Sequence, residues 1–286
     1  MIQSMTGFGK ASLQLPTKKI TVEIKSLNSK GLDLNTRMPS VFREMELGLR
    51  NQISQRLERG KVDFSLYVEV TGEETTSKIN VPIVKGYINQ MKAVIPNADE
   101  TELMKMAVRM PDALKTERDE IDENEWKQIQ TVIDEALENI ANFRKDEGAS
   151  LEKEFQLRIS NINNLMTEAV SYDAERIETV KTRLRTSLDE LKVNVDENRF
   201  EQELIFYLEK YDITEEKVRL GNHLNYFLET LNGTEANGRK LGFITQEMGR
   251  EINTMGSKSN HTEMQKLVVM MKDELEKIKE QVLNVL

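Results

Sequence analysis

An apolar stripe with coiled-coil spacing runs through the middle of the chain and constrains the fold more than any other feature. Its positions step mostly by four and three residues: Leu151, Phe155, Arg158, Ile162, Leu165, Ala169, Tyr172, Ile177, Val180, Leu184, Leu188 and Leu191. Neither Gly nor Pro interrupts it, so the spacing predicts one or two helices totalling about forty residues, roughly 60 Å at 1.5 Å per residue. A second such stripe continues to the last residues: Met264, Val268, Met271, Leu275, Ile278, Val282 and Val285. Because neither stripe can be buried by its own helix, we expect helical hairpins or bundles between subunits, and therefore a homo-oligomer.

The N-terminal part of the chain has the period of a β-sheet instead. Apolar and polar residues alternate over residues 20–24 and 62–70, which predicts strands with one face in water. Residues 42–57 between them have helical spacing, and a short strand is expected around Leu32 and Leu34. We therefore predict an α+β fold class, with an N-terminal antiparallel sheet and a helix. A mainly α-helical half follows, with long coiled-coil-like helices and a C-terminal helical domain.

The change of period also indicates how the chain is divided. We predict an N-terminal domain over residues 1–150, a long helical arm over residues 151–200 and a C-terminal helical domain over residues 201–286. Within the first of these, we expect the sheet over residues 1–71, a loop over residues 72–80, helices over residues 81–94 and 125–145, and short helical pieces over residues 96–124.

Composition excludes several classes of protein. The chain has no cysteine and only two histidines, so any metal would be held mainly by oxygen, which favours Mg²⁺, Mn²⁺ or Ca²⁺. No run of 18 apolar residues and no signal peptide are visible, so we expect a cytoplasmic protein with no membrane contact. Motifs for a P-loop, dinucleotide binding, a zinc protease or a nucleophile elbow are absent from the sequence.

The charge is unevenly distributed along the chain. The formal net charge is −9, which argues against a polyanionic partner, because nucleic-acid affinity comes mainly from Lys and Arg on phosphates. Residues 1–71, however, carry eleven bases and seven acids. A second basic segment contains Arg239, Lys240, Arg250 and Lys258. A chain of this kind can bind RNA or DNA if the two basic surfaces converge.

The same C-terminal segment carries two carboxylates one helical turn apart, Glu247 and Glu251. The buried stripe of its predicted helix consists of Leu241, Ile244, Met248 and Ile252. Carboxylates at this spacing can share a divalent cation, or raise each other's proton affinity and serve as acid and base. The alternative is an ordinary solvated helix face on which Glu247 pairs with Arg250.

A polar ridge precedes this segment. Glu216, Arg219 and His223 are spaced to lie on one face of a helix. His223 can carry a proton or ligate a metal, because imidazole titrates near neutral pH; the alternative is a purely structural histidine. If the two helices pack side by side, we expect the ridge, the carboxylate pair, Arg250 and Glu203 to line one cleft.

Segments spread over nearly the whole chain carry a family resemblance. They are residues 1–9 (MIQSMTGFG), 23–33, 144–148 and 211–216, Arg219-Leu220 with His223, and the GRKL, QEM, REINT and GSKS blocks of residues 238–259. On these segments the chain resembles the YicC/YloC family of bacterial proteins. Gly242, Gly249 and Lys30 depart from the residues usual in that family, which are Asp, Asn and Arg.

The resemblance implies a metal-dependent endoribonuclease that acts on RNA and assembles as a hexameric ring. The matched positions are Glu216, Arg219, His223, Arg239, Lys240, Gln246, Glu247, Arg250, Glu251, Asn253, Thr254 and Lys258. We predict that Glu216, Glu247 and Glu251 hold Mg²⁺ or Mn²⁺. The predicted catalytic residues are Glu247, Glu251, His223, Arg250 and Lys258. The predicted RNA-binding residues are Arg37, Arg43, Arg59, Lys61, Arg219, Arg239 and Lys240.

Two other functions are compatible with the same residues. The chain could be a non-catalytic RNA-binding or scaffold protein that recruits another nuclease, in which case it would bind RNA without divalent ions and never shorten it. It could also be a purely structural helical assembly factor, which would show no salt-sensitive RNA binding.

Overall fold

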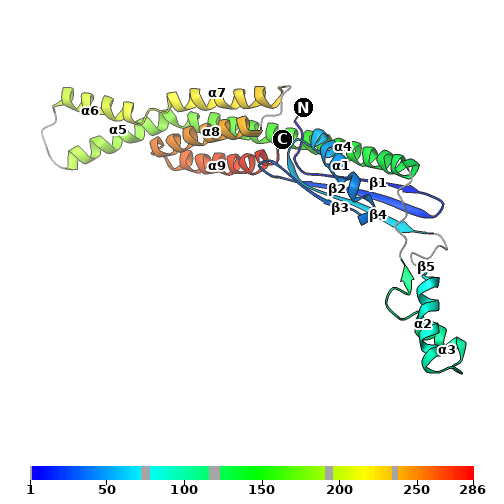
Figure 1. Cartoon of the computed structure of the whole chain (residues 1–286). Coiled ribbons are helices and arrows are strands. Elements are labelled where there is room, and N and C mark those ends of the chain that lie inside the picture. The colour runs from blue at the N-terminus through cyan, green and yellow to red at the C-terminus, as the bar shows by residue number, and fades with distance from the viewer. Residues whose placement is uncertain (1, 72–77, 116–122, 191–195, 234–237) are drawn as a thin grey trace.

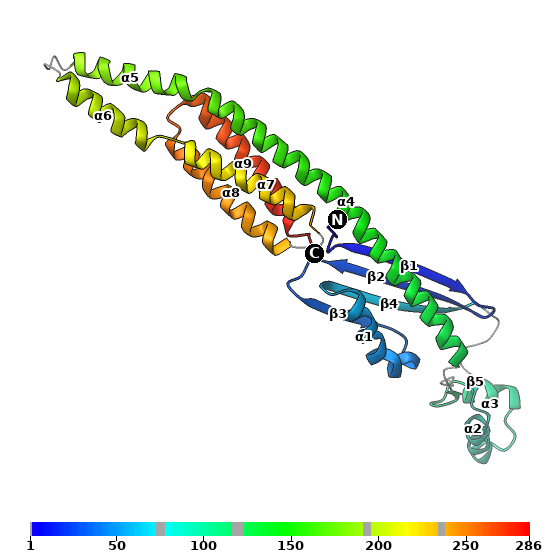
Figure 2. The ribbon, with the colours of Figure 1, turned by 90° about the horizontal axis from the view of Figure 1, so that it is seen from above.

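The structure, a computed structural model, describes residues 2–71, 78–115, 123–190, 196–233 and 238–286. The molecule is elongated, with a sheet at one end and a helical bundle at the other (Figures 1 and 2). Helix α4 (Glu123–Ser171) runs along both parts, and after a bend at Tyr172 the chain continues as α5 (Asp173–Glu190). The predicted long helix is therefore present, and it begins much earlier than the stripe indicated. It also crosses the predicted domain boundary at residue 150.

The sheet at the N-terminal end has the strand order β1-β2-β4-β3. Strands β1 (Gly7–Gln14), β2 (Lys18–Leu27) and β4 (Gly60–Val70) pair antiparallel, whereas β3 (Leu32–Arg37) pairs parallel to β4. The 3₁₀-helix η1 (Ser40–Met45) and helix α1 (Glu46–Arg56) lie between β3 and β4. These helices return the chain to the end of the sheet where β3 began, which makes the pair parallel. The expected antiparallel sheet is thus mixed at this edge.

One face of the sheet is buried by two helices. The alternating residues of β2 and β4, among them Ile20, Val22, Val62 and Phe64, are fully buried. They share a core with Ile133 of α4 and with side chains of α1. Figure 2 shows α4 crossing β1 and β2, whereas α1 lies beside the edge strand β3. The predicted α+β fold class, with a sheet domain followed by a mainly helical half, is confirmed.

A small unit projects from the far end of the sheet (Figure 1). It consists of β5 (Lys78–Ile79), α2 (Val81–Val94), α3 (Glu100–Ala107) and β6 (Leu114–Lys115). Its core is formed by Val84, Ala107 and Ala113. The predicted helix over residues 81–94 is confirmed. Much of the predicted loop over residues 72–80 lies outside the described residues, as do residues 116–122 of the segment between the two predicted helices.

The helical half is a bundle of α4, α7 (Thr214–Leu231), α8 (Gly238–Lys258) and α9 (Thr262–Val282) around one apolar core. The two predicted stripes meet here within a single chain, since α4 residues such as Phe155 and α9 residues such as Leu275 share that core. Helices α5 and α6 (Glu197–Lys210) form an arm beyond the bundle (Figures 1 and 2). Leu191, the last predicted stripe position, lies outside the described residues. Of the helices that the structure describes, none is both long enough and apolar enough to cross a membrane.

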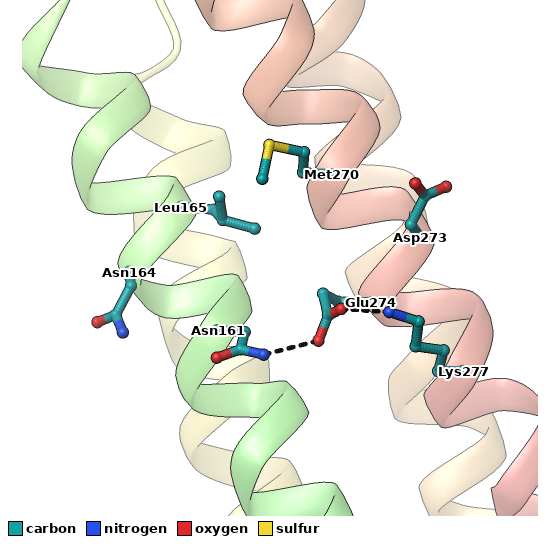
Figure 3. Close-up of a pocket in the computed structure, with 7 residues that line it drawn as sticks. All are labelled: Asn161, Asn164, Leu165, Met270, Asp273, Glu274 and Lys277. Atoms are coloured by element: carbon teal, nitrogen blue, oxygen red, sulfur yellow. Dashed lines mark hydrogen bonds and ion pairs between the residues drawn. The ribbon is translucent and has the colours of Figure 1, made fainter.

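A polar cluster locks α4 to α9 (Figure 3). Glu274 of α9 accepts hydrogen bonds from Asn161 Nδ2 at 2.9 Å, Arg158 Nη1 at 3.2 Å and Lys277 Nζ at 2.6 Å. Burial alone would raise the pKa of Glu274, but the bonds from Lys277, Asn161 and Arg158 lower it to about 2. Arg158, a stripe position in the sequence, therefore contributes an ion pair rather than an apolar contact.

The N-terminal segment joins the two halves. Ser4 forms a β-bridge with Val285, and Met5 N–H donates to the Asn284 carbonyl at 2.7 Å. The buried Arg144 of α4 donates to the Met5 carbonyl at 3.2 Å and also to Ser26 Oγ. A side chain at Gly148 would overlap the Ile2 carbonyl oxygen, because the segment crosses α4 at that residue. Helix α4 continues through Gly148. The predicted end of a helix at residue 145 was therefore wrong.

Candidate functional site

Helices α7 and α8 lie side by side as an antiparallel pair, and two contacts fix their alignment. At one end Lys258 Nζ of α8 lies 2.8 Å from Glu216 Oε1 of α7. At the other end Lys240 Nζ of α8 lies over the ring of Tyr226 of α7, 4.7 Å from its centroid. We call the surface between these contacts the α7–α8 face. Its members are Glu216, Arg219, His223 and Tyr226 of α7 and Lys240, Glu247, Arg250, Glu251, Thr254 and Lys258 of α8.

The helical period places four of the α8 members of this face, Lys240, Glu247, Glu251 and Lys258, in one row. Lys240 and Lys258 are separated by five full turns, and Glu247 and Glu251 lie within about 20° of the same line at 3.6 residues per turn. Between the two end contacts, the antiparallel pairing puts His223 at the level of Glu247 and Arg219 at the level of Glu251. The two helices pack side by side, as the sequence-based expectation required, and the common cleft of the ridge and the carboxylate pair stays a prediction.

The ion pair between Glu216 and Lys258 is the most buried interaction of the face. The Glu216 side chain is 7% exposed and the Lys258 side chain 27% exposed. The second carboxylate oxygen, Glu216 Oε2, is buried and accepts no hydrogen bond from the residues that the structure describes. The nearby Asp212 accepts from the Thr214 hydroxyl and backbone N–H, and these bonds, with the charge of Lys258, lower its pKa. Lys258 thus pairs with Glu216, and its charge also lowers the pKa of Asp212.

Arg176 holds this end of the face in place. It lies in α5 just after the bend, is 4% exposed and pairs with Asp173 at 2.5 Å. Its Nη1 donates to the Tyr211 carbonyl at 2.5 Å and to the Lys258 carbonyl at 3.2 Å. The Arg176 guanidinium therefore links α5, at the base of the arm, to the residues just before α7 and to the end of α8. No pattern in the sequence marks Arg176, because two of its three partners are backbone carbonyls.

Two arginines of the face form exposed ion pairs. Arg250 Nη1 lies 2.7 Å from Glu247 Oε1, as the alternative interpretation of this helix expected, and Arg219 Nη2 lies 2.5 Å from Glu215 Oε1. Pairs of this kind contribute only about 0–1 kcal/mol, so both guanidiniums can exchange their carboxylates for a phosphate at little cost. Glu251 differs from its neighbours. It is 8% exposed, and its carboxylate has no hydrogen bond or ion pair with any described residue.

The predicted three-carboxylate metal site is not formed within one chain. The described part of the chain contains no group of three or more His, Asp or Glu side chains placed to hold a metal ion. The partner of Glu216 is the ammonium group of Lys258, not a cation shared with Glu247 and Glu251. Glu203, the further acid expected in this cleft, lies on α6 in the arm. Glu247 and Glu251 stay together, one turn apart on α8.

The predicted RNA-binding bases of the N-terminal half fall into two groups. Arg59 donates from Nε to the Ser29 carbonyl at 2.7 Å, and it lies with Lys61 at the sheet end that meets the helical half, where Asn28 bonds to the Leu283 carbonyl. Arg239 and Lys240 lie at this same joint, in the first turn of α8, because the preceding Gly238 packs against Val285. Arg37 and Arg43 instead lie at the opposite end of β3, where both line a separate pocket.

Tyr226 is a member of the face that the sequence analysis did not select. The residue is 45% exposed, and the Lys240 ammonium lies over one side of its ring. The available signal was its position three residues after His223, on the same side of α7. An exposed ring beside a cationic group is a surface on which a nucleic-acid base can stack.

The fold and this face define a class: a two-part α+β protein whose helical bundle carries a mixed acidic and basic face suited to a polyanionic ligand. The chain belongs to the endoribonuclease YicC-like family. A model of the family's N-terminal region matches residues 2–153, and a model of its C-terminal region matches residues 169–286.

Two relatives align with the chain from end to end. A protein of Clostridioides difficile (strain 630) named probable endoribonuclease YicC is 33% identical over 293 aligned residues, which cover the whole of both chains. A protein of Haemophilus influenzae (strain ATCC 51907 / DSM 11121 / KW20 / Rd) with the same name is 29% identical over 287 aligned residues, which cover 99% of each chain. The resemblance seen in the sequence segments is thereby confirmed over the full length.

Proposed function

We propose that this endoribonuclease cleaves RNA phosphodiester bonds at the α7–α8 face. The observation that carries the proposal is Glu251, a carboxylate with 8% exposure that no described cation or donor neutralises. Its carboxylate oxygens still reach solvent, unlike the buried Glu216 Oε2, so they are open to a cation or a substrate. It lies one turn from Glu247, in a row that begins and ends with a lysine. Family membership and the names of both relatives support the type of reaction.

The side chains of the face divide the work of binding and cleavage. Lys240 and Tyr226 hold one nucleotide, through its phosphate and by stacking of its base. Arg219 and Arg250 leave their exposed carboxylate partners and bind the scissile phosphate, where their charge stabilises the transition state. Lys258 adds a fixed positive charge at the other end, held by Glu216. His223, at the level of Glu247, carries the proton to or from the reacting oxygen.

The carboxylate pair fits a divalent cation of the magnesium type. Mg²⁺ is usually bound by one or two carboxylates together with substrate phosphates, rather than by a complete protein cage. Glu247 and Glu251 supply such a pair, and Glu216 is not needed as a ligand. A bound Mg²⁺ or Mn²⁺ would polarise the phosphate and activate water. Mn²⁺ titration by calorimetry should show binding to the wild type and loss of that binding in Glu251→Gln.

The cleavage assay uses a labelled single-stranded RNA with and without a chelator. The test variant is Glu247→Gln/Glu251→Gln. The matched control is Glu229→Gln/Glu280→Gln, which removes two charges from exposed positions of α7 and α9. We expect the test variant to lose cleavage by at least about 100-fold, in line with loss of electrostatic catalysis, and the control to cleave normally. Equal cleavage by the wild type and the test variant would refute the assignment of this face.

A non-catalytic RNA-binding protein is the second candidate. The observation in its favour is that Glu216 and Glu247 already have cationic partners in the structure. It predicts RNA binding of equal strength in chelator and in Mg²⁺, with no shortening of the strand by highly purified protein under either condition.

We also infer that the protein is a homo-oligomer, with six copies as the family resemblance implies. Support comes from the arm, where Ile205 and Phe206 of α6 are 55% and 61% exposed. Light scattering should give about six times the chain mass of 33.0 kDa, and Ile205→Ser/Phe206→Ser should lower the measured mass. A wild-type mass of one chain would refute the inference.

A further inference from the structure

A pocket at the edge of the sheet has the features of a separate anion site. It has a volume of about 400 Å³ and is lined by Thr36, Arg37, Met38, Ser40, Arg43 and Glu46. It lies between the end of β3, which is an edge strand, and the helices η1 and α1. Helix α4 covers β1 and β2 and leaves this edge open (Figure 2). The pocket is therefore accessible and lies apart from the α7–α8 face.

The positive charges of the pocket are not compensated. Arg37 and Arg43 are both exposed, and neither forms an ion pair or side-chain hydrogen bond within the described ranges of the chain. Glu46, the acidic group of the lining, is bonded by the Thr36 hydroxyl at 2.6 Å and by Arg50 Nε at 3.0 Å. These two bonds, together with the charges of Arg50 and Arg43, lower the pKa of Glu46. Arg37, Arg43 and Arg50 thus face one carboxylate, which leaves an excess of positive charge for a ligand.

The walls of the pocket are fixed before any ligand binds. Arg50 also donates from Nη1 to the Leu34 carbonyl at 3.0 Å and from Nη2 to the Thr36 hydroxyl at 2.9 Å. One side chain thus ties α1 to the end of β3, so the residues that flank the pocket need little ordering upon binding. Sites organised in this way lose less entropy when a ligand binds, and so gain affinity.

We propose that this pocket binds the terminal phosphate of an RNA strand. A phosphate monoester carries a charge of about −1.5 to −2 at pH 7, which matches two unpaired guanidiniums, whereas each internal phosphodiester carries a single charge. Arginine is suited to this task because its planar fork donates two parallel hydrogen bonds to phosphate oxygens. The Ser40 hydroxyl lies in the same lining and is a further donor. The choice of an RNA strand rests on the proposed function; the preference for a terminal phosphate rests on the pocket alone.

The test compares short RNA strands of one sequence that carry a phosphate or a hydroxyl at the 5′ end or at the 3′ end. Binding is measured by anisotropy in chelator, with adenosine 5′-monophosphate as a competitor that separates recognition of a free nucleotide from recognition of a strand end. We expect the wild type to bind a phosphorylated strand at least about 5-fold more tightly than the hydroxyl strand, given the extra charge-assisted bonds. Arg37→Ala/Arg43→Ala should abolish this difference. Arg56→Ala, an exposed arginine of α1 outside the pocket, should keep it.

The outcomes separate this proposal from the proposed function. Equal affinity of the wild type for phosphorylated and hydroxyl strands at both ends would overturn the pocket, even if the enzyme cleaves RNA normally. A preference that survives Arg37→Ala/Arg43→Ala would overturn it too. If the wild type fails to cleave RNA but prefers phosphorylated strands through these arginines, the pocket stands and the cleavage assignment falls. The preference should persist in Glu247→Gln/Glu251→Gln, because those residues lie on the other half of the molecule.

Discussion

Replacing Lys258 by methionine tests whether the Glu216–Lys258 pair is a structural anchor of the α7–α8 face. Methionine keeps much of the apolar stem of lysine but removes the ammonium group. The Glu216 carboxylate, 7% exposed with one oxygen already unpartnered, would then be buried without a cation. Breaking a buried ion pair by removing one partner costs about 3–5 kcal/mol. Because Lys258 is 27% exposed and water can reach its site, we expect about 2–3 kcal/mol in this case.

Thermal unfolding followed by circular dichroism measures this effect. A loss of this size should lower the midpoint by about 5–10 °C for a chain of this length. Lys266→Met is the matched control, because it breaks an exposed pair with Glu263 and should cost at most about 0.5 kcal/mol. The double variant Glu216→Gln/Lys258→Met removes both charges and should recover at least half of the loss.

Two results would refute this reasoning. One is an equal midpoint for Lys258→Met and Lys266→Met, which would show that the pair contributes no more than an exposed one. The other is a double variant as unstable as Lys258→Met, because the unpaired carboxylate would then not be the cause. If the double variant is stable yet cleaves no RNA, the pair itself acts in the reaction and not only in the fold.

Two further predictions concern the rest of the bundle and the joint. The pKa of Glu274 is about 2 in the folded protein against an ordinary value of 4.5. Its contribution to stability is therefore present above pH 4.5 and lost as the pH falls towards 2. Denaturant titrations at several pH values should show that Glu274→Gln reduces this loss of stability, whereas the control Glu276→Gln, at an exposed position, does not. Gly148→Ala should destabilise the protein by at least about 1–3 kcal/mol through overlap with Ile2. Gly221→Ala in α7, with open space around it, should stabilise by up to about 1 kcal/mol, and equal shifts for the two variants would contradict the close crossing.

Periodicity predicted the elements whose apolar residues face one core. The strands around Val22 and Val62 and the two long stripes are of this kind. Strand β1 escaped notice because glycines stand where apolar side chains would mark a period. A side chain at Gly9 would overlap the Ala136 carbonyl oxygen of α4, so the strand is recognisable only by what packs against it. Gly148 lies just beyond the predicted end of the helix over residues 125–145, and α4 continues through it, where Ile2 crosses the helix.

The pairing of elements distant in the sequence could not be predicted from local patterns. The parallel alignment of β3 with β4 depends on where η1 and α1 return the chain. For the candidate site, the spacing of Glu247 and Glu251 followed from one helix, and their common row with Lys258 followed with it. The partner of Glu216, however, lies 42 residues away, and only the packing of α7 on α8 decides that it is a lysine rather than a shared metal ion.

The row of α8 residues has a fixed length, and this sets a scale for the substrate. Lys240 stands at the joint with the sheet, and Lys258 is fastened by Arg176 at the root of the arm. Five uninterrupted turns of helix separate their Cα atoms by about 27 Å. The two ammonium groups lie closer together, at Glu216 and Tyr226, which are about 15 Å apart along α7. This spacing sets a minimum length for an RNA that contacts both ammonium groups at once.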